Sequence, residues 1–426
     1  MKVAFYTLGC KVNQYDTQAM AELVKSAGHE VVPFEKTADA YVINSCTVTA
    51  ESDRKTRQAI GKAKKKNPQA AVVVAGCYAQ HAGKELWMRG DVDAVLGTGN
   101  RQEIVRVLER TQHGERLDAV TEYGKTARYE EGQGALIDRA RAYLKIQDGC
   151  DRHCTYCIIP KARGPIRSRS LAALQAETQR AAELGHREIV LTGIRLASYG
   201  REQGLTLSDA IKAAAQTDVH RIRLGSLDPD EISPEFIRAC AEEEKLCRQF
   251  HLSLQSGCDN TLKRMARRYT TAEFEHTVKE ILQAMPDAVF TTDIMCGFVG
   301  ETQADHEASL AFCEKIGFAK MHVFPYSKRE GTAAARMPGH LPQAEKQRRA
   351  AEMIALDKKL ERAHLQALVG SVQEVILETP QDGGYLGHTR GYAPVVVQGQ
   401  ALAPMQIVQA EIVSAEDFAA KGVAKG

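Results

Sequence analysis

Short apolar runs alternate with amphipathic segments through the first quarter of the chain. Continuous apolar strands separated by helices are typical of a parallel sheet that is covered on both faces. Residues 1–112 are therefore predicted to form a doubly wound α/β domain. The strands are expected at Val3–Leu8, Ala40–Asn44, Val72–Ala75 and Ala94–Leu96, and the helices at Thr17–Ala27, Ser52–Lys66 and Arg101–Arg110.

A strand followed by a helix recurs about six times over residues 137–366. A closed barrel of the common kind needs eight such units, so six favour a partial, open (β/α)6 barrel. The predicted strands are Ala142–Gln147, Glu188–Thr192, Arg221–Leu227, Phe250–Gln255, Val289–Ile294 and Met321–Phe324.

The pattern changes again near the end of the chain. After a long helix near Gln343–Leu368, β-like runs appear at Val372–Glu378, Pro394–Gln398 and Gln406–Val413. Residues 367–426 are predicted to form a small antiparallel β-barrel. Residues 113–136 are rich in charge and glycine and lack periodicity, which predicts a linker. The chain as a whole is expected to be of the α/β class.

Composition is ordinary for a soluble globular protein. Of 426 residues, 44% are hydrophobic and 26% charged, and the net charge is only +2. No apolar run is long enough for a membrane span, and the N-terminus lacks the features of a signal peptide. Eleven cysteines in such a chain indicate a reducing cytoplasm, where grouped cysteines are more often metal ligands or catalytic than disulfides.

Three of these cysteines, Cys150, Cys154 and Cys157, form a CxxxCxxC motif. A structural zinc site needs four closed ligands. Three cysteines suit a cubane iron–sulfur cluster, whose fourth iron then stays open to another ligand. A zinc knuckle with a distant fourth ligand is the alternative interpretation.

A second set of three cysteines follows from the strand pattern. Cys10, Cys46 and Cys77 each follow one of the first three predicted strands. Because the carboxyl ends of parallel strands share one edge of a sheet, we expect the three thiols to lie together there. The alternative is that each is a small buried residue at a strand end.

With these motifs the chain resembles the radical S-adenosylmethionine methylthiotransferases. The resemblance implies an N-terminal domain with an auxiliary cluster, a radical core and a C-terminal TRAM domain. The matching segments are Thr7–Thr17, Ile43–Val48, Ala75–Cys77, Gly149–Gly164, Leu191–Ile194, Arg223–Ser226, Leu254–Gly257, Thr292–Ile294 and Phe324–Thr332.

The resemblance also implies the cofactors. Two [4Fe–4S] clusters are expected, one on Cys150, Cys154 and Cys157 and one on Cys10, Cys46 and Cys77. The first would cleave S-adenosylmethionine to a 5′-deoxyadenosyl radical, with electrons from a flavodoxin- or ferredoxin-type donor. The second would carry the sulfur that a second S-adenosylmethionine methylates. Candidate S-adenosylmethionine contacts are Tyr156, Thr192, Gly193, Ser226 and Gln255.

Within that family the motifs look most like the MtaB type. That type methylthiolates carbon 2 of N6-threonylcarbamoyladenosine at tRNA position 37, so the expected partner is a tRNA anticodon stem-loop. The same chemistry on isopentenyladenosine 37, or on an aspartate of a ribosomal protein, is the alternative. A non-catalytic RNA-binding protein that carries clusters is a third hypothesis.

Basic clusters are the expected RNA contacts. Arg54–Lys66 holds seven cations and no acid. A solvated helix face would explain that run equally well. Arg163, Arg167 and Arg329 are tentative substrate contacts near the predicted core site. Residues 369–426, in contrast, hold six acids and three bases. An RNA-binding module is normally positive, so this balance favours the protein-substrate alternative.

Overall fold

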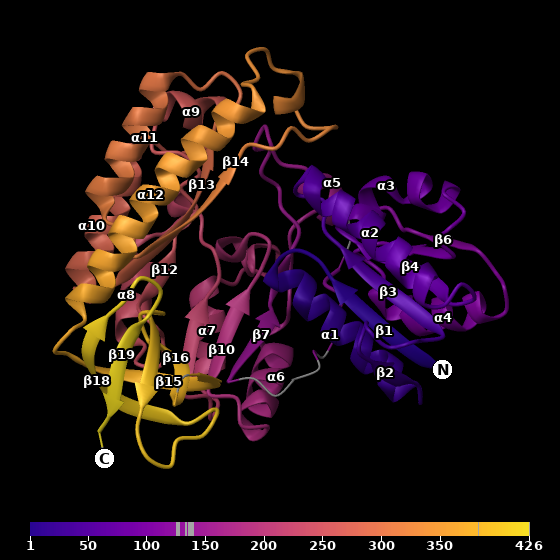
Figure 1. The fold of residues 1–426 in the computed structure, drawn as a ribbon, viewed down its shortest axis with the longest axis horizontal. Helices are drawn as coiled ribbons and strands as arrows, with labels where there is room; N and C mark the ends of the chain where they lie inside the picture. Colours follow the sequence, from indigo (N-terminus) through magenta and orange to yellow (C-terminus); the bar gives the residue numbers. More distant parts are fainter. Residues whose placement is uncertain (125–127, 133, 135–139, 382, 426) are drawn as a thin grey trace.

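The computed structural model describes the chain except residues 125–127, 133, 135–139, 382 and 426. Figure 1 shows three parts: an N-terminal sheet domain, a central set of strands surrounded by helices, and a small C-terminal barrel that packs beneath the central strands. No helix of the described part is long and apolar enough to cross a membrane.

The N-terminal domain is a six-stranded parallel sheet in the order β2-β1-β3-β4-β5-β6. Every residue of β3 and β4 is buried, as their continuous apolar sequences predict. The strands are β1 (Lys2–Thr7), β2 (Glu30–Val32), β3 (Ala40–Ser45), β4 (Ala71–Gly76), β5 (Ala94–Leu96) and β6 (Leu117–Ala119).

Helices cover both faces of this sheet, which confirms the doubly wound prediction. The apolar cluster on one face includes residues of α2 (Ala50–Lys66) and α3 (Cys77–Met88). The cluster on the other face includes residues of α1 (Lys11–Ser26) and α4 (Ile104–Gln112).

Some elements differ from the sequence prediction. Helix α1 begins six residues earlier than expected, because the polar side chains of its first turns are buried against other parts of the protein. Helix α3 was not predicted. The segment predicted as a linker contains the edge strand β6, while its residues 125–127, 133, 135 and 136 lie outside the described residues.

The central part confirms the partial barrel. Two parallel three-stranded sheets, β11-β10-β7 and β12-β13-β14, are joined by a bridge between Leu227 and Leu252. Their strands are β7 (Arg141–Lys145), β10 (Glu188–Thr192), β11 (Arg221–Leu224), β12 (Gln249–His251), β13 (Val289–Cys296) and β14 (Lys320–Pro325). Helix α1 of the N-terminal domain lies beside β7 (Figure 1).

Helices form the outer layer of the barrel (Figure 1). Outward-facing residues such as Leu144, Leu191 and Leu252 are buried in one large apolar core with these helices. The helices are α6 (Leu171–Glu183), α7 (Leu207–Ala215), α8 (Pro234–Glu242), α10 (Thr271–Ala284), α11 (Gln303–Ile316) and α12 (Gln343–Ala367).

The inward-facing side of these strands is polar. Tyr143, His251 and Asp293 stay partly exposed although their sequence neighbours are buried, and His322 is exposed beside the buried Met321. Because successive strand residues point to opposite faces, this alternation places polar, accessible groups inside the barrel. The His251 and His322 rings lie 5.8 Å apart, and His251 Nε2 lies 3.3 Å from Asp293 Oδ2.

The C-terminal segment forms the small barrel that was predicted. It closes in the order β15-β16-β17-β19-β18, and its one departure from antiparallel pairing is the β17–β19 pair, which is parallel. The strands are β15 (Val372–Gln381), β16 (Gly384–Thr389), β17 (Pro394–Gln398), β18 (Ile407–Ala415) and β19 (Ala420–Ala424).

Two of the acids in this small barrel face the central barrel. Glu374 pairs with Arg221 at 2.7 Å, and Glu378 pairs with Arg141 at 2.8 Å. Tyr392 lies against the guanidinium groups of Arg141 and Arg223, at 4.8 and 4.7 Å from its ring centroid. Two of the six acids in this segment therefore form ion pairs with the central barrel. These two acids are not evidence for a basic protein partner.

The Arg223–Glu188 pair gives a test of this packing. Its two hydrogen bonds are 2.8 and 2.9 Å long, and both side chains are buried. Burial alone would raise the pKa of Glu188, but Arg223 and its neighbours lower it to about 2. Replacing Arg223 by Met should lower the apparent free energy of unfolding by about 3–5 kcal/mol in urea denaturation, because a buried carboxylate loses its bidentate partner.

The double variant Arg223→Met/Glu188→Met should recover most of that loss, since an apolar replacement of a whole buried pair is often neutral. Arg248→Met is the matched control, because its pair with Asp287 is exposed and should contribute less than about 1 kcal/mol. Equal losses in the single and double variants would contradict the role given to the pair.

Candidate active site between two sets of cysteines

The first cysteine set lies in a loop at the carboxyl end of the barrel. Cys150, Cys154 and Cys157 follow β8 (Gln147–Asp148) and precede α5 (Ile159–Arg163). The Cys150 N–H donates to Gly164 O at 3.0 Å, and the Thr155 N–H donates to Met265 O at 3.0 Å. These bonds tie the start and the middle of the loop to neighbouring backbone.

The surroundings of this loop favour neutral thiols. Burial raises the pKa of Cys150 to about 11 and that of Cys157 to about 12. Arg267 Nη1 lies 3.7 Å from Cys154 Sγ. Iron would supply the positive charge that thiolates need in this setting, because metal binding displaces the thiol proton.

The second set lies at the carboxyl edge of the N-terminal sheet, as the strand pattern predicts. Cys10 is the N-cap of α1, Cys46 directly follows β3, and Cys77 is the first residue of α3. Cys10 is exposed, whereas Cys46 and Cys77 are buried. The N-termini of α1 and α3 thus lie at this set, and the dipoles of the two helices favour negative charge there.

Close packing surrounds the second set. A Cβ atom at Gly9, whose φ is +104°, would lie only 2.7 Å from Cys46 Cβ. Burial raises the pKa of Cys46, and it raises that of Cys77 to about 12 even though Arg163 Nε donates to Cys77 Sγ at 3.3 Å. The position before Cys10 therefore requires glycine both for its conformation and for space.

Each set has three cysteines, the number of protein ligands that leaves one iron of a cubane cluster open. Among the described residues, no three His, Cys, Asp or Glu side chains converge closely enough to hold one metal ion. In a cubane each cysteine binds a different iron, so the sulfur atoms stand farther apart than the ligands of one ion.

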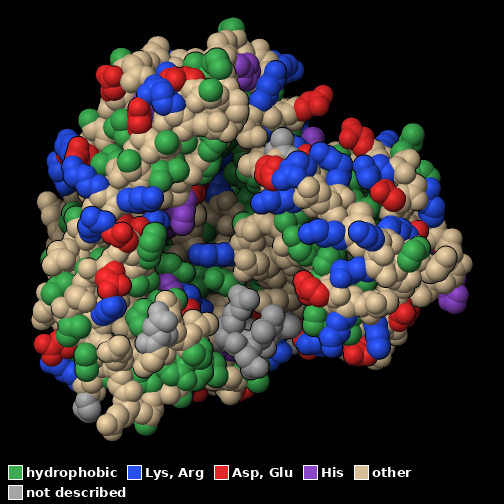
Figure 2. Space-filling model, in the orientation of Figure 1, with side chains coloured by type: hydrophobic (Ala, Val, Ile, Leu, Met, Phe, Trp, Pro, Cys, Tyr) green, Lys and Arg blue, Asp and Glu red, His purple; other side chains and the backbone are tan. Residues whose placement is uncertain are grey.

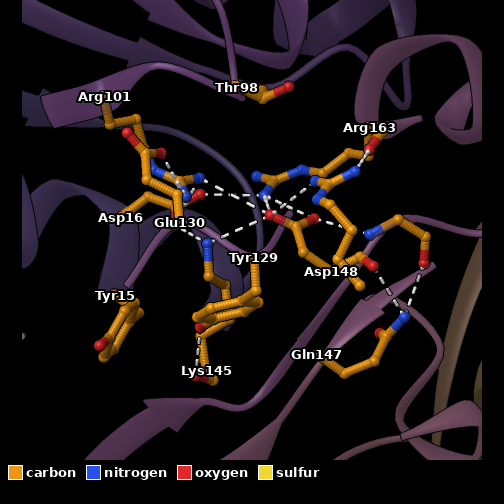
Figure 3. A network of polar contacts seen from close by, with 12 residues as sticks. Tyr15, Asp16, Thr98, Arg101, Tyr129, Glu130, Lys145, Gln147, Asp148 and Arg163 are labelled. Atoms are coloured by element: carbon orange, nitrogen blue, oxygen red, sulfur yellow. Dashed lines mark hydrogen bonds and ion pairs between the residues drawn. The ribbon is translucent and has the colours of Figure 1, made fainter. Parts of the chain in front are cut away.

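Arg163 connects the two sets. It ends α5, directly after the first cysteine loop, and its guanidinium reaches Cys77 of the second set. Its Nη1 atom also lies 2.9 Å from Asp16 Oδ2 and 3.2 Å from Asp148 Oδ2. Lys145 Nζ joins the same two carboxylates at 2.7 and 3.1 Å (Figure 3).

This ion network is buried where the two domains meet. Arg101 lies 2.9 Å from Asp16 and 2.8 Å from Glu130, so the N-terminal domain and the segment before β7 both contribute (Figure 3). Burial alone would raise the pKa of Asp148, but Lys145 and Arg163 hold it well below its usual range. The Asp148 carboxylate is therefore ionised at neutral pH.

The network contains one more basic side chain than acidic ones, although burial and Arg101 lower the pKa of Lys145. Its four cations are Arg101, Lys145, Arg163 and Arg167, and its three acids are Asp16, Glu130 and Asp148. An uncompensated charge is costly in a buried site. Because Arg163 faces Cys77, the negative charge of cluster thiolates at the second set would balance it.

A cavity of about 200 Å³ lies between the two sets. Its lining includes Val48 and Thr49, which follow Cys46, and Cys157 of the first set. Tyr156 and Gln255 line it as well, as do Asp293 and Phe324 from neighbouring strand ends. Gln255 has a φ of +67°, a strained backbone that is often found at functional sites.

The structure brings together two of the five predicted S-adenosylmethionine contacts, Tyr156 and Gln255, in this cavity. Thr192 is buried at the end of β10, and Ser226 is exposed just beyond β11. A Cβ atom at Gly193 would lie 2.9 Å from Gln147 Cβ, so that glycine serves close packing. These three do not line the cavity between the cysteine sets.

The three arginines predicted to contact the substrate are all buried. Arg163 and Arg167 belong to the ion network, and Arg329 binds Asp53 and Thr47 beside Cys46. Their guanidinium groups contact other side chains of this chain, and a contact of these arginines with the substrate stays a prediction. Arg329 holds the loop after β14 to the N-terminal domain, next to the second cysteine set.

Sequence reasoning did not identify Asp16, Arg101, Lys145 or Asp148. One signal was available, because Lys145 interrupts an otherwise apolar strand and must find a partner when buried. The partner itself, 129 residues away in the sequence, could not be inferred from local pattern.

Lys11 lies beside the second set and faces the barrel. Its Nζ atom lies 5.7 Å from the ring centroid of Tyr143 on β7. The residue is exposed, yet desolvation by the surrounding protein lowers its pKa, and Arg141 and Arg223 lower it further. A side chain that solvent can reach, but that is largely surrounded by protein, lines a recess. Figure 2 shows a hollow between the N-terminal domain and the barrel, with Lys and Arg side chains in it.

Comparison with known families gives two matches along the chain. Residues 2–97 match the family described as "Uncharacterized protein family UPF0004". Residues 144–313 match the radical SAM superfamily. The first match contains Cys10, Cys46 and Cys77, and the second contains the CxxxCxxC loop.

Several curated proteins are similar over nearly the whole chain. The threonylcarbamoyladenosine tRNA methylthiotransferase MtaB of Bacillus subtilis is 38% identical over 97% of this chain and 94% of its own length. The MtaB of Aquifex aeolicus is 39% identical over 84% of this chain and 88% of its own length. The tRNA-2-methylthio-N(6)-dimethylallyladenosine synthase of Moorella thermoacetica is 32% identical over 98% of this chain and 96% of its own length.

Solved structures show the same fold at low sequence identity. The radical S-adenosylmethionine methyltransferase TsrM of Kitasatospora setae superposes with a TM-score of 0.56 at 14% identity, covering 75% of this chain and 74% of its own. That likeness supports the arrangement of sheet domain and partial barrel.

The ion network gives a pH-dependent test. Replacing Asp148 by Asn should lower the apparent free energy of unfolding at pH 6 by about 3–5 kcal/mol, because Lys145 and Arg163 lose a shared counter-charge. The folded-state pKa of Asp148 is depressed. Its stabilisation is therefore present above the unfolded pKa, about 3.9, and is lost as pH falls below that value.

The stability of the wild type should accordingly fall more steeply than that of Asp148→Asn between about pH 4 and pH 2. Urea denaturation at each pH measures both slopes. The exposed Glu103, which pairs with Arg106, supplies the control Glu103→Gln, with an expected change below about 1 kcal/mol. Parallel pH slopes for wild type and Asp148→Asn would show that the network does not hold this carboxylate ionised.

Proposed function

Because this chain belongs to the radical S-adenosylmethionine tRNA methylthiotransferases, as its 36–39% identical relatives show, we propose that it methylthiolates carbon 2 of N6-threonylcarbamoyladenosine at position 37 of tRNA. Membership of the superfamily implies a [4Fe–4S] cluster and S-adenosylmethionine. The observation that carries the proposal is the cavity lined by residues next to both cysteine sets.

We assign one [4Fe–4S] cluster to each cysteine set. Cys150, Cys154 and Cys157 would hold the cluster that binds S-adenosylmethionine, and Cys10, Cys46 and Cys77 the auxiliary cluster. When bound, these groups and two molecules of S-adenosylmethionine supply a 5′-deoxyadenosyl radical and a methylated sulfur, which the C–H bond at adenine carbon 2 requires. An electron donor of the flavodoxin or ferredoxin type would reduce the cluster of the Cys150 loop.

The residues of the chain then have positioning roles. Tyr156 and Gln255 line the cavity from the radical side, and Val48 and Thr49 line it from the auxiliary side. Arg163 fixes the spacing of the two sets, because one guanidinium contacts Cys77 and the carboxylates that anchor the barrel. Apolar neighbours such as Phe324 and Met295 exclude water from the cavity, which protects a radical from side reactions.

Two observations favour the threonylcarbamoyl substrate over the isopentenyl one. The relatives that act on threonylcarbamoyladenosine are 36–39% identical, against 30–32% for those named for dimethylallyladenosine. The inward face of the barrel carries Tyr143, His251, Asp293 and His322, which suit a polar substituent. An aliphatic isopentenyl group could neither donate nor accept a hydrogen bond there.

The tRNA would bind across the hollow of Figure 2. Lys and Arg side chains gather on the N-terminal domain over α2 in that view. The bases of an anticodon loop can be unstacked at a low free-energy cost. One base would enter the cavity while the RNA backbone stays on the basic surface. Because the proposed substrate is tRNA, the reaction would take place in the cytoplasm.

Nucleoside mass spectrometry tests the substrate. Cells of the source organism without the gene should lose 2-methylthio-N6-threonylcarbamoyladenosine and accumulate its precursor, and the wild-type gene should restore it. Loss of the isopentenyl derivative would identify the other tRNA substrate. Unchanged tRNA would refute the proposal and direct attention to a protein substrate.

The two cluster assignments predict different defects. Purified Cys154→Ala should lose both S-adenosylmethionine cleavage and tRNA modification, because the radical cannot form. Cys77→Ala should keep formation of 5′-deoxyadenosine but lose methylthiolation, because only the sulfur site is removed. Each variant should hold about half the iron of the wild type, measured after anaerobic reconstitution.

Cys240→Ala is the control, since that cysteine is buried in α8 and belongs to neither set. It should keep both activities. Full methylthiolation by Cys77→Ala, or zinc in place of iron in the wild type, would refute the assignment of the auxiliary cluster.

The basic face of α2 predicts a salt-dependent affinity. Lys55, Lys62 and Lys65 are exposed, and no carboxylate of the described residues forms an ion pair with them. Changing the three to Gln should weaken binding of anticodon stem-loop RNA and reduce the slope of log K against log salt by about one for each lost phosphate contact. Fluorescence anisotropy at several salt concentrations measures both quantities.

The matched control changes Lys279, Lys315 and Lys359, three exposed lysines of the barrel helices that already pair with glutamates. RNA affinity and salt slope should stay as in the wild type. Equal effects of the two triple variants would show that only net charge matters.

A further inference from the structure

Lys11 occupies a place that the chemistry of the cysteines does not explain. It directly follows Cys10 as the first residue of α1, and its ammonium lies 5.7 Å from the ring centroid of Tyr143 on the inner face of the barrel. The side chain is exposed. Among the described residues, no carboxylate forms an ion pair with Lys11 and no hydrogen bond engages its ammonium.

The acids around Lys11 already contact other side chains. Glu188 is bound by two hydrogen bonds from Arg223, and Glu378 pairs with Arg141. The Asp293 carboxylate lies 3.3 Å from His251 Nε2. An exposed ammonium that forms no ion pair with the described carboxylates, and that lies over an inward-facing ring, is a candidate binding position for an anion.

The proposed substrate carries an anion in the required place. In the purine ring only N1 and C6 separate carbon 2 from N6, so a base held with carbon 2 near the cysteine sets presents its N6 substituent close beside them. The threonylcarbamoyl group ends in a carboxylate and a hydroxyl, whereas an isopentenyl group has neither. Lys11 lies next to Cys10 and points to the polar inner face of the barrel, where this substituent would extend.

We propose that Lys11 is a specificity-determining residue that binds the carboxylate of the threonylcarbamoyl substituent at the mouth of the barrel. This inference rests on the proposed function and adds to it the group that distinguishes threonylcarbamoyladenosine from other adenosines at position 37. The cation contributes binding energy only when the substituent is anionic, so the selectivity is electrostatic. Tyr143 positions the ammonium through a cation–π contact.

The test uses the reconstituted full-length enzyme and three synthetic anticodon stem-loop RNAs. The first carries N6-threonylcarbamoyladenosine, the second its neutral methyl ester, and the third isopentenyladenosine. For the wild type, kcat/KM should be about 10-fold to 100-fold lower with the ester than with the acid, the range expected for one charge-assisted hydrogen bond. This comparison needs no variant and therefore does not depend on the folding of one.

Lys11→Met should lose a similar factor with the acid and should treat acid and ester alike, within about twofold. Lys11→Arg, which keeps the positive charge, should retain most of the preference for the acid. Iron and sulfide content and the electron paramagnetic resonance spectrum of the reduced clusters report whether Cys10 still holds its cluster, a readout that loss of a substrate contact would not move. Lys25→Met, at the exposed end of the same helix, is the matched control and should behave as the wild type.

The possible outcomes separate the two proposals. Equal wild-type rates with acid and ester would overturn the role of Lys11 alone. A Lys11→Met variant that loses the same factor with acid, ester and isopentenyl RNA would instead indicate a contact to the RNA backbone, and would also overturn it. Wild-type activity on isopentenyl RNA with none on either threonylcarbamoyl RNA would overturn the proposed substrate together with this inference.

Discussion

The arrangement of this protein depends on a group of buried charges that no single domain can satisfy. Asp16 belongs to the N-terminal domain and Asp148 to the barrel, yet Lys145 and Arg163 bind both carboxylates. Removing one partner from a buried pair is costly, so the two domains are fixed in the one relative position that pairs all of them. The distance between the cysteine sets follows from that constraint, since Arg163 also contacts Cys77.

The parts that could be predicted from the sequence are those with a local cause. Continuous apolar strands and their cysteine ends identify the sheet and its carboxyl edge, because the backbone alone places Cys10, Cys46 and Cys77 there. The number of strand–helix units likewise predicts a partial barrel, and the change of period predicts the small terminal barrel. Helix α3 was missed because it begins directly at Cys77, without a polar cap before it.

The parts that could not be predicted depend on pairing between distant residues. Arg163, Arg167 and Arg329 look in the sequence like cations available to RNA, and only their carboxylate partners, up to 276 residues away, show that they are buried. The acids of the terminal barrel are the reverse case. Glu374 and Glu378 look like a repulsive surface for RNA, but they neutralise Arg221 and Arg141 at the base of the central barrel. Net charge counted along the chain is therefore a poor guide to the charge that a ligand meets.

The ring of Tyr392 has a consequence for the order of events in a catalytic cycle. It lies against Arg141 and Arg223 and covers the amino end of the barrel with a residue of the terminal domain. That end of the interior is therefore covered, and the face that carries both cysteine sets lies at the opposite end. On the proposed chemistry, a nucleotide bound across that face would close the exit behind any small molecule already inside. On that arrangement S-adenosylmethionine would bind before the tRNA, and its nucleoside product would leave after it.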